Sequence, residues 1–279
     1  TPDLRVLPQS MSSENQGSMR SEPAFFAPPL LLFLIGLMLA IHAYRALILG
    51  LFEETDVQLL RLTAFVPARF SVAIDLADLA EVQQDVLLAS AELRPLRMAL
   101  FQTFVADGDA AWWTLVSYAF LHASWEHVIF NGLWMLAFGS PVMWRLGPIR
   151  FLLFFAVTAA AAAVFHAGLN RLDVSILIGA SGAVSGLTAA ALRFAIGPYG
   201  FGIAPDQVFR PLAPLGSALR DRRVQLFIAI WFGINLLAGL GIPVGGGDSG
   251  LRIAWEAHVG GFLAGLLLFP LFDPVRSGD

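Results

Sequence analysis

The sequence predicts an all-α, polytopic membrane protein with six transmembrane helices and a long first loop. Of its 279 residues, 57% are hydrophobic and only 14% are charged, and the mean hydropathy is +0.71. A soluble domain carries far more charge than this. A bilayer-spanning helix needs about 20 apolar residues. Apolar runs close to this length lie near Phe25–Gly50, Val128–Trp144, Phe151–Leu169, Ser175–Leu192, Val224–Ile242 and Ala257–Phe272.

The first run is expected to stay in the protein as a helix and not to be cleaved as a signal peptide. It is longer than the apolar core of a usual signal peptide, and no A-x-A cleavage pattern follows it. Pro28 and Pro29 stand at its start, where a first helical turn tolerates proline. Arg45 near its far end can extend its charge to the interface. His42, and His166 in the third run, are expected at the interface as well.

Arginine placement predicts the orientation. The loops after the second and fourth runs hold most of the loop arginines, whereas those after the third and fifth hold only Arg171 and Arg252. Short loops rich in basic residues stay in the cytoplasm. Both termini are therefore expected in the cytoplasm and the odd-numbered loops outside. The absence of lysine and of a targeting signal favours a bacterial inner membrane, and an organellar membrane stays open.

The predicted organisation has three parts. Residues 1–24 are polar and serine-rich and are expected to be disordered. Residues 25–273 form the membrane domain, and 274–279 a short cytoplasmic tail. Within the membrane domain, residues 51–112 form a long outer-face loop with amphipathic pieces that lie on the membrane or pack on the bundle.

Composition also excludes several classes of function. The chain has no cysteine, so it has neither a disulfide framework nor a cysteine-based zinc or redox site. The net charge of −4 offers no basic patch for nucleic acid. His122 and His127 are five positions apart, which is not the i, i+4 spacing of helical metal ligands, and no H-E-x-x-H accompanies them. A metal site is therefore not expected.

Polar side chains inside the runs are candidates for function because they are costly in a bilayer. His122, His127 and Asn131 lead into the second run, Ser181 lies in the fourth, and His258 opens the sixth. All three runs start on the predicted outer side. If residues 173–181 were helical, Ser181 would lie about 10 Å below the outer boundary, as would His258.

Glycine spacing brings two of these groups together. Gly182 and Gly186, and likewise Gly261 and Gly265, form G-x-x-x-G, a pattern that lets membrane helices approach closely. Ser181 directly precedes Gly182. His258 lies three positions before Gly261, on the same helix face. The serine hydroxyl and the imidazole are therefore expected to meet across a glycine-lined seam.

A serine beside a histidine has the elements of acyl transfer. The imidazole can take the proton that makes serine a weak nucleophile. His127 and Asn131 share a helix face and can donate to an oxyanion, and a serine near a helix start adds backbone N–H groups. No acidic third member accompanies them. A lone serine among glycines and alanines is usually a packing residue, and Ser185 is interpreted in that way.

These residues resemble the rhomboid intramembrane serine proteases. "GASG" at 179–182 is similar to the family's G-x-S-G, "HASWEHVIFN" to its H-x4-H-x3-N, and "AHVGG" to its histidine motif on the sixth helix. The resemblance implies a rhomboid-like bundle in which Ser181 is the nucleophile and His258 its base. It also implies an oxyanion hole formed by His127, Asn131 and the Ser181 N–H, and supporting roles for His122, Gly179, Gly182 and Gly261.

The resemblance also implies the partners, which are single-span or other transmembrane protein substrates, cleaved near the outer face of the lipid bilayer without a cofactor. The sequence departs from the family at Ser185, where an aromatic residue is usual, and at Thr114 and Met143. A catalytically weak rhomboid-like protein that binds membrane segments is the alternative. A transporter is disfavoured because no inverted repeat and no acidic residue within a run were found. The sequence predicts no particular oligomeric state.

Overall fold

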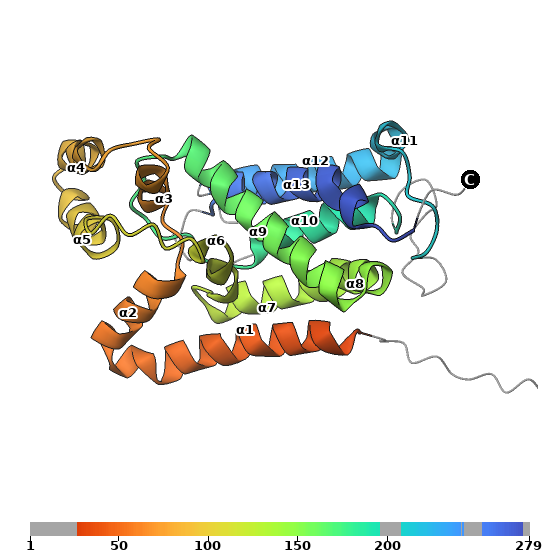
Figure 1. Cartoon of the computed structure of the whole chain (residues 1–279), viewed down its shortest axis with the longest axis horizontal. Helices are drawn as coiled ribbons and strands as arrows, with labels where there is room; N and C mark the ends of the chain where they lie inside the picture. The colour runs from red at the N-terminus through yellow and green to blue at the C-terminus, as the bar shows by residue number, and fades with distance from the viewer. Residues whose placement is uncertain (1–26, 196–207, 241, 243–252, 276–279) are drawn as a thin grey trace, which may run out of the picture.

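The computed structural model describes residues 27–195, 208–240, 242 and 253–275, and this part of the chain is all-helical (Figure 1). Within it no strand is present, and an isolated bridge joins Phe65 to Leu177. The longer helices of the bundle are α1 (Pro29–Leu47), α7 (Trp125–Trp134), α8 (Ser140–Leu146), α9 (Pro148–Leu169), α10 (Ser181–Leu192), α12 (Arg222–Gly239) and α13 (Trp255–Phe272). The predicted disordered segment at 1–24 and the predicted tail beyond residue 275 lie outside the described residues.

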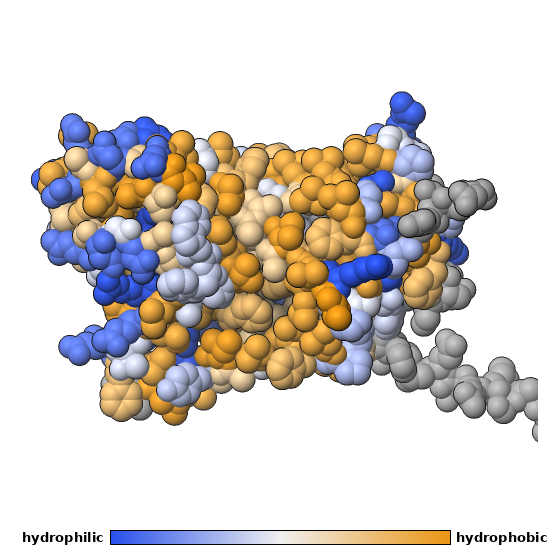
Figure 2. Space-filling view, viewed as in Figure 1, coloured by the Kyte–Doolittle hydropathy of each residue, from blue (hydrophilic) through white to orange (hydrophobic). Residues whose placement is uncertain are grey.

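On the face shown in Figure 2, an apolar band covers the middle of the molecule between two more hydrophilic ends. Three helices are long and apolar enough to cross a membrane, namely α1, α9 and α13. A chain with such helices is expected to reside in a bilayer. Of the other three predicted spans, the fifth corresponds to the continuous helix α12, whereas the second and the fourth are less regular.

The second predicted span is a composite. α7 continues into a π-helical turn, η3 (Met135–Gly139), and then into α8. Ser124 caps the start of α7 by accepting a hydrogen bond from the His127 N–H at 3.2 Å, which supplies one of the unpaired donors of the first turn. The helical segment therefore begins at Trp125 and not at Val128 as predicted, and the π turn rotates α8 relative to α7.

The fourth predicted span is shorter than expected. A helix over Ser175–Leu192 is wrong at its start, since α10 begins at Ser181. Residues 172–180 run without helical structure, and Leu177 pairs with Phe65. Every residue of α10 after Ser181 is buried. Because α10 is surrounded by other helices, it does not need the length of a lipid-facing span, and irregular backbone before it is covered by protein.

The predicted outer loop folds into a helical layer at one end of the bundle, drawn at the left of Figure 1. It contains η1 (Leu49–Leu51), α2 (Glu53–Thr63), α3 (Pro67–Ala73), α4 (Leu79–Leu88) and α5 (Arg94–Phe104), followed by α6 (Thr114–Ser117) and η2 (Tyr118–Phe120). We call this end the loop end.

A separate core holds the loop layer against the bundle. Val82 and Val86 of α4 pack with Phe101 and Phe104 of α5, and Val174 joins the same buried cluster. The burial of these side chains, at roughly 1.5–3 kcal/mol each, stabilises the contact. The loop layer is therefore packed on the segment that leads directly into α10.

Two histidines expected at the interface are buried instead. His42 is 5% exposed, and its Nδ1 lies 3.2 Å from the His122 carbonyl oxygen. His166 is 7% exposed and lies 3.6 Å from the Glu256 carboxylate. Arg45, expected to extend to the interface, pairs with Asp56 of α2 at 2.8 Å. The loop layer supplies the partner of Arg45, whereas the partners of His42 and His166 come from the segment before α7 and from α13.

The opposite end is held by a buried ion pair. Arg145 of α8 bonds Asp273 at 2.6 Å, and their side chains are 0% and 4% exposed. Arg145 also donates to the carbonyls of Val208 and Arg210. Its guanidinium lies 4.7 Å from the centre of the Phe194 ring. The short helix α11 (Leu215–Arg220) follows the segment that Arg145 holds.

Candidate active site

Ser181 is the first residue of α10, so its neighbouring N–H groups point out of the helix end. The N–H groups in the first turn of a helix have no intrahelical acceptor, and the helix dipole makes this end partly positive. The chain reaches Ser181 through Gly179, whose φ is +120°, and Ala180, whose φ and ψ are already helical. Only glycine adopts the Gly179 conformation without strain. The "GASG" stretch thus turns the chain sharply into the helix.

His258 stands in the first turn of α13 and meets Ser181 directly. The Ser181 Oγ lies 2.7 Å from His258 Nε2. Both side chains are half-buried. The contact predicted from the glycine spacing is therefore present. A hydroxyl at this distance from an imidazole nitrogen can pass its proton to it.

Close backbone approach between α10 and α13 makes this contact possible. A Cβ built at Gly261 would lie 1.9 Å from the carbonyl oxygen of Gly182, and one at Gly265 would lie 2.1 Å from that of Gly186. No side chain larger than hydrogen fits at either position. The two G-x-x-x-G patterns form the seam as predicted, and it extends for about one helical turn beyond the Ser181–His258 pair.

His127 of α7 lies on the other side of Ser181, against Gly179. A Cβ at Gly179 would come within 2.7 Å of His127 Nε2 and within 3.7 Å of Ser181 Oγ. The His127 Nδ1 accepts the Ala123 N–H at 3.5 Å. A neutral imidazole that accepts at Nδ1 carries its proton on Nε2. The Nε2–H is thus available to donate beside the serine.

His122 supports the backbone beside the serine. Its ring packs edge-on against His127 with 5.0 Å between centroids. Its Nε2 accepts the Ala180 N–H at 3.5 Å, and its carbonyl accepts Arg45 Nη1 at 3.2 Å. His122 therefore connects the segment before Ser181 to Arg45 of α1.

Two residues of the predicted set bond within their own helices. The Asn131 amide donates to the His127 carbonyl at 2.8 Å and is 6% exposed. Ser185 donates to the Ser181 carbonyl at 2.7 Å. Ser185 therefore behaves as the packing residue that was predicted. Asn131 lies on the same helix face as His127 but is one turn deeper.

Comparison with known proteins identifies the family of the chain. The model of the Rhomboid domain matches residues 109–273 of the chain, which is more than half of its length. The chain belongs to the rhomboid family. As a rhomboid with apolar spanning helices, it is an integral membrane protein.

Two curated rhomboids resemble the chain. It is 30% identical to the rhomboid protease GlpG of Serratia proteamaculans (strain 568) over 156 residues, which are 56% of this chain and 46% of that protein. It is 35% identical to the rhomboid protein YdcA of Bacillus subtilis (strain 168) over 83 residues, which are 30% of this chain and 40% of that protein. The chain thus matches less than half the length of either relative.

One polar residue at the candidate site was not identified from the sequence. Asn235 of α12 is hydrogen-bonded through Oδ1 to His258 Nδ1. It is 9% exposed. The signal was available, since an asparagine in the middle of the apolar Val224–Ile242 run is costly unless it has a partner. Nothing in the spacing along the chain relates it to His258, which is 23 positions away.

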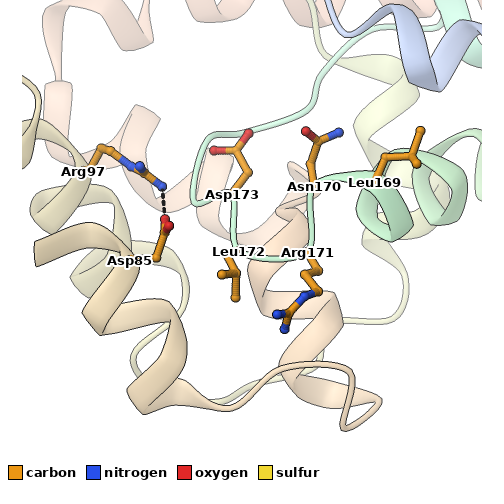
Figure 3. Close-up of a pocket in the computed structure, with 7 residues that line it drawn as sticks. All are labelled: Asp85, Arg97, Leu169, Asn170, Arg171, Leu172 and Asp173. Atoms are coloured by element: carbon orange, nitrogen blue, oxygen red, sulfur yellow. Dashed lines mark hydrogen bonds and ion pairs between the residues drawn. The ribbon is translucent and has the colours of Figure 1, made fainter. Parts of the chain in front are cut away.

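An open hollow of about 360 Å³ at the loop end lies apart from this site (Figure 3). Asp85 and Arg97, paired at 2.7 Å, form one wall of it, and the turn after α9 forms the other. This second wall is lined by Leu169 at the end of α9 and by the turn residues Asn170, Arg171, Leu172 and Asp173. Ser181, His258, His127 and Asn131 do not line it.

Proposed function

We propose that this rhomboid is an intramembrane serine endopeptidase that uses a dyad of Ser181 and His258. The proposal rests chiefly on one observation, the 2.7 Å between Ser181 Oγ and His258 Nε2. A serine is a poor nucleophile until a neighbouring base takes its proton. The name of the matched Serratia proteamaculans protein, a rhomboid protease, points to the same reaction.

Acylation begins when Ser181 Oγ attacks the carbonyl carbon of a substrate peptide bond. The hydroxyl proton moves to His258 Nε2, and the carbonyl oxygen becomes an oxyanion. When the C–N bond breaks, the electron pair goes to the amide nitrogen, which receives the proton from His258 and leaves as an amine. The product is an ester between the substrate acyl group and Ser181.

Water completes the reaction by reversing these roles. His258 Nε2 takes a proton from a water molecule whose oxygen attacks the acyl carbon. The C–O bond to Ser181 then breaks, and the serine oxygen recovers the proton from His258. The sum is one peptide bond and one water consumed, and one carboxylic acid and one amine formed. The half-buried position of both side chains is compatible with water reaching them.

The oxyanion needs donors that are already in place. We assign this role to the His127 Nε2–H beside Gly179 and to the N–H of Ser181 at the helix start. Preorganised donors of this kind stabilise developing charge without reorganisation. Asn131 completes the proposed set from one turn deeper. His122, Gly179, Gly182 and Gly261 support it by holding the backbone.

The proposal includes a topology. Six helical segments cross the bilayer, with both termini in the cytoplasm and the site opening to the outer side, and residues 51–112 form an outer-face loop within a protease domain at 25–273. In this arrangement the loop end faces outward and the arginine-rich end faces the cytoplasm. The location is a bacterial inner membrane. The substrates are transmembrane segments of membrane proteins, cleaved near the outer face.

The test is cleavage of a single-span protein substrate by the protein reconstituted in liposomes. Wild type is expected to cleave, and Ser181→Ala and His258→Ala are expected to lose at least about 10³-fold in kcat. Ser185→Ala is the matched control, since it removes a serine hydroxyl from the same helix one turn away. It is expected to retain cleavage.

Two outcomes would reject the proposal. Equal cleavage by wild type and both dyad variants would remove Ser181 and His258 from the chemistry. Binding of the substrate by a correctly folded wild type, without any cleavage, would favour the rhomboid-like binding protein instead. Labelling of Ser181 by a fluorophosphonate, which reacts with activated serines, provides an independent readout.

A further inference from the structure

We propose that Asn235 of α12 is a positioning residue that holds His258 in the tautomer and orientation the serine needs. The working site is then an array of Ser181, His258 and Asn235 contributed by three helices. This inference rests on the proposed protease function and extends it by a third member.

The amide of Asn235 has its orientation set by the helix backbone. Its Nδ2 donates to the carbonyl oxygen of Trp231, one turn earlier in α12, at 2.7 Å. With the amide nitrogen committed there, the oxygen Oδ1 faces His258 Nδ1. An amide oxygen only accepts hydrogen bonds. The group presented to His258 is therefore an acceptor.

An acceptor at Nδ1 determines where the histidine proton resides. A neutral imidazole carries one N–H, and the bond made by one nitrogen sets the state of the other. With Nδ1–H donating to Asn235, Nε2 has a free lone pair directed at Ser181 Oγ, 2.7 Å away. This is the tautomer that a general base requires. The opposite tautomer would leave two lone pairs facing each other at Asn235.

The helix packing keeps Asn235 opposite His258. One turn to one side, Trp231 of α12 stacks on Phe262 of α13, with 4.7 Å between ring centroids. One turn to the other side, Trp255 of α13 fills the space over Gly239, where an added Cβ would lie 2.4 Å from the indole. The polar pair lies between these two aromatic contacts, so neither helix can slide without breaking one of them.

The bond also matters during the reaction. When His258 takes the serine proton, both ring nitrogens become donors, and the Nδ1–H bond to Asn235 becomes charge-assisted. Charge-assisted bonds are stronger than neutral ones. Asn235 therefore stabilises the imidazolium, which exists only along the reaction path. Removal of the Asn235 side chain is thus expected to lower kcat and not to raise KM.

The first experiment measures kcat, KM and the pH profile of the reconstituted protein. Asn235→Leu removes the acceptor at similar volume and is expected to lower kcat by roughly 10- to 100-fold, the range known for residues that orient metal-binding histidines through the same kind of hydrogen bond. KM is expected to stay within about twofold. The acid limb of the profile is expected to move to lower pH, because the imidazolium has lost its acceptor.

Two comparison variants make the result specific. Asn235→Asp restores an acceptor at the same place and is expected to recover most of kcat, with the acid limb displaced to higher pH by the added negative charge. Gln225→Leu is the matched control in the same helix, far from His258, and is expected to keep the wild-type kcat. The titratable neighbours of His258 are His127 and His166, the latter beside Glu256. These groups are the same in all variants. A shift of the acid limb of the pH profile can therefore be attributed to the change at residue 235.

The second readout does not depend on cleavage. Nitrogen NMR of the protein labelled with ¹⁵N-histidine in detergent micelles distinguishes the two tautomers, and the His258 signals are assigned by their loss in His258→Ala. Wild type is expected to show a protonated Nδ1, and Asn235→Leu a mixture. Should wild type fail to cleave, the protease proposal fails, but this spectrum still decides the role of Asn235. An unchanged tautomer in Asn235→Leu, or an unchanged kcat in a cleaving protein, would overturn the inference.

Discussion

The carbonyl oxygen of Gly182 lies so close to Gly261 that a Cβ added there would be 1.9 Å away from it. This contact sets the separation of α10 and α13. It therefore also sets the distance between Ser181, which lies on α10, and His258, which lies on α13. The chemistry of the site therefore depends on a packing contact that contains no polar side chain.

Gly261→Ala is expected to push α13 away from α10 and separate the dyad. Overpacking of a dense interior typically costs about 1–3 kcal/mol. We expect a loss of more than about tenfold in kcat together with a lower thermal midpoint, measured by the cleavage assay and by unfolding in micelles. Gly36→Ala in α1 is the control, because an added Cβ there meets nothing within 4 Å. Wild-type kcat in Gly261→Ala would contradict the role of the seam.

Gly179→Ala is expected to damage the site through His127. The φ of +120° disfavours any side chain, and the new Cβ would come within 2.7 Å of His127 Nε2. The strain costs of order 1–3 kcal/mol, and the displaced imidazole can no longer donate beside the serine. We expect kcat to fall while fluorophosphonate labelling of Ser181 slows. Gly168→Ala, where nothing lies within 4 Å, should leave both unchanged.

His127 and Asn131 are expected to contribute unequally to the oxyanion hole. His127 lies beside Gly179 and Ser181, whereas the Asn131 amide donates to the His127 carbonyl. Loss of a direct oxyanion donor costs roughly 10²–10³-fold in kcat. We expect His127→Ala to show that loss and Asn131→Ala a smaller one, with KM nearly constant in both. The reverse order would mean that Asn131 is the principal donor.

Arg145 is expected to govern stability and not catalysis. Removal of one partner of a buried ion pair leaves an uncompensated charge and costs about 3–5 kcal/mol. Arg145→Met leaves the buried carboxylate of Asp273 without its partner, so the thermal unfolding midpoint should drop markedly. Activity per folded molecule should stay close to wild type, because the pair lies at the end of the bundle opposite the loop end. Arg150→Met, on the exposed start of α9, controls for loss of an arginine.

The ion pair of Glu81 and Arg171 is expected to make attachment of the loop layer pH-dependent. The hydrogen bond from the Arg171 guanidinium, at 2.8 Å, lowers the pKa of Glu81 below its ordinary value of 4.5. A carboxylate with a lowered pKa stabilises the folded state above its ordinary pKa, and this contribution is lost as the pH falls through the lowered one. Both side chains are well exposed, so the effect is small and is screened by salt.

The measurement compares wild type with Glu81→Gln by thermal unfolding in micelles. Wild type should be slightly more stable at neutral pH, and the difference should vanish in acid below the pKa of Glu81. It should also shrink in high salt. A difference that persists at low pH would show that the contact is not ionic.

Prediction from the sequence worked where a feature depends on residues near one another in the chain. The two G-x-x-x-G patterns place small residues on one helix face, so the seam at Gly261 followed from spacing alone. It failed at residues 175–180, because an apolar run of this kind does not show whether it is helical or extended. The bridge of Leu177 to Phe65 is a long-range pairing that takes the place of helix in this stretch.

By itself, the sequence determined the membrane class, the all-helical fold and the pairing of Ser181 with His258, because the length of apolar runs and the spacing of glycines can be read locally along the chain. Only the tertiary structure decided that Asn235 meets His258, that His42 and His166 are buried, and that α10 begins at the serine. Each of these depends on how segments that the sequence does not relate to one another pack in three dimensions. The hydrogen bond between Asn235 and His258 leaves no periodic pattern in either helix, so it is seen only once the bundle is assembled.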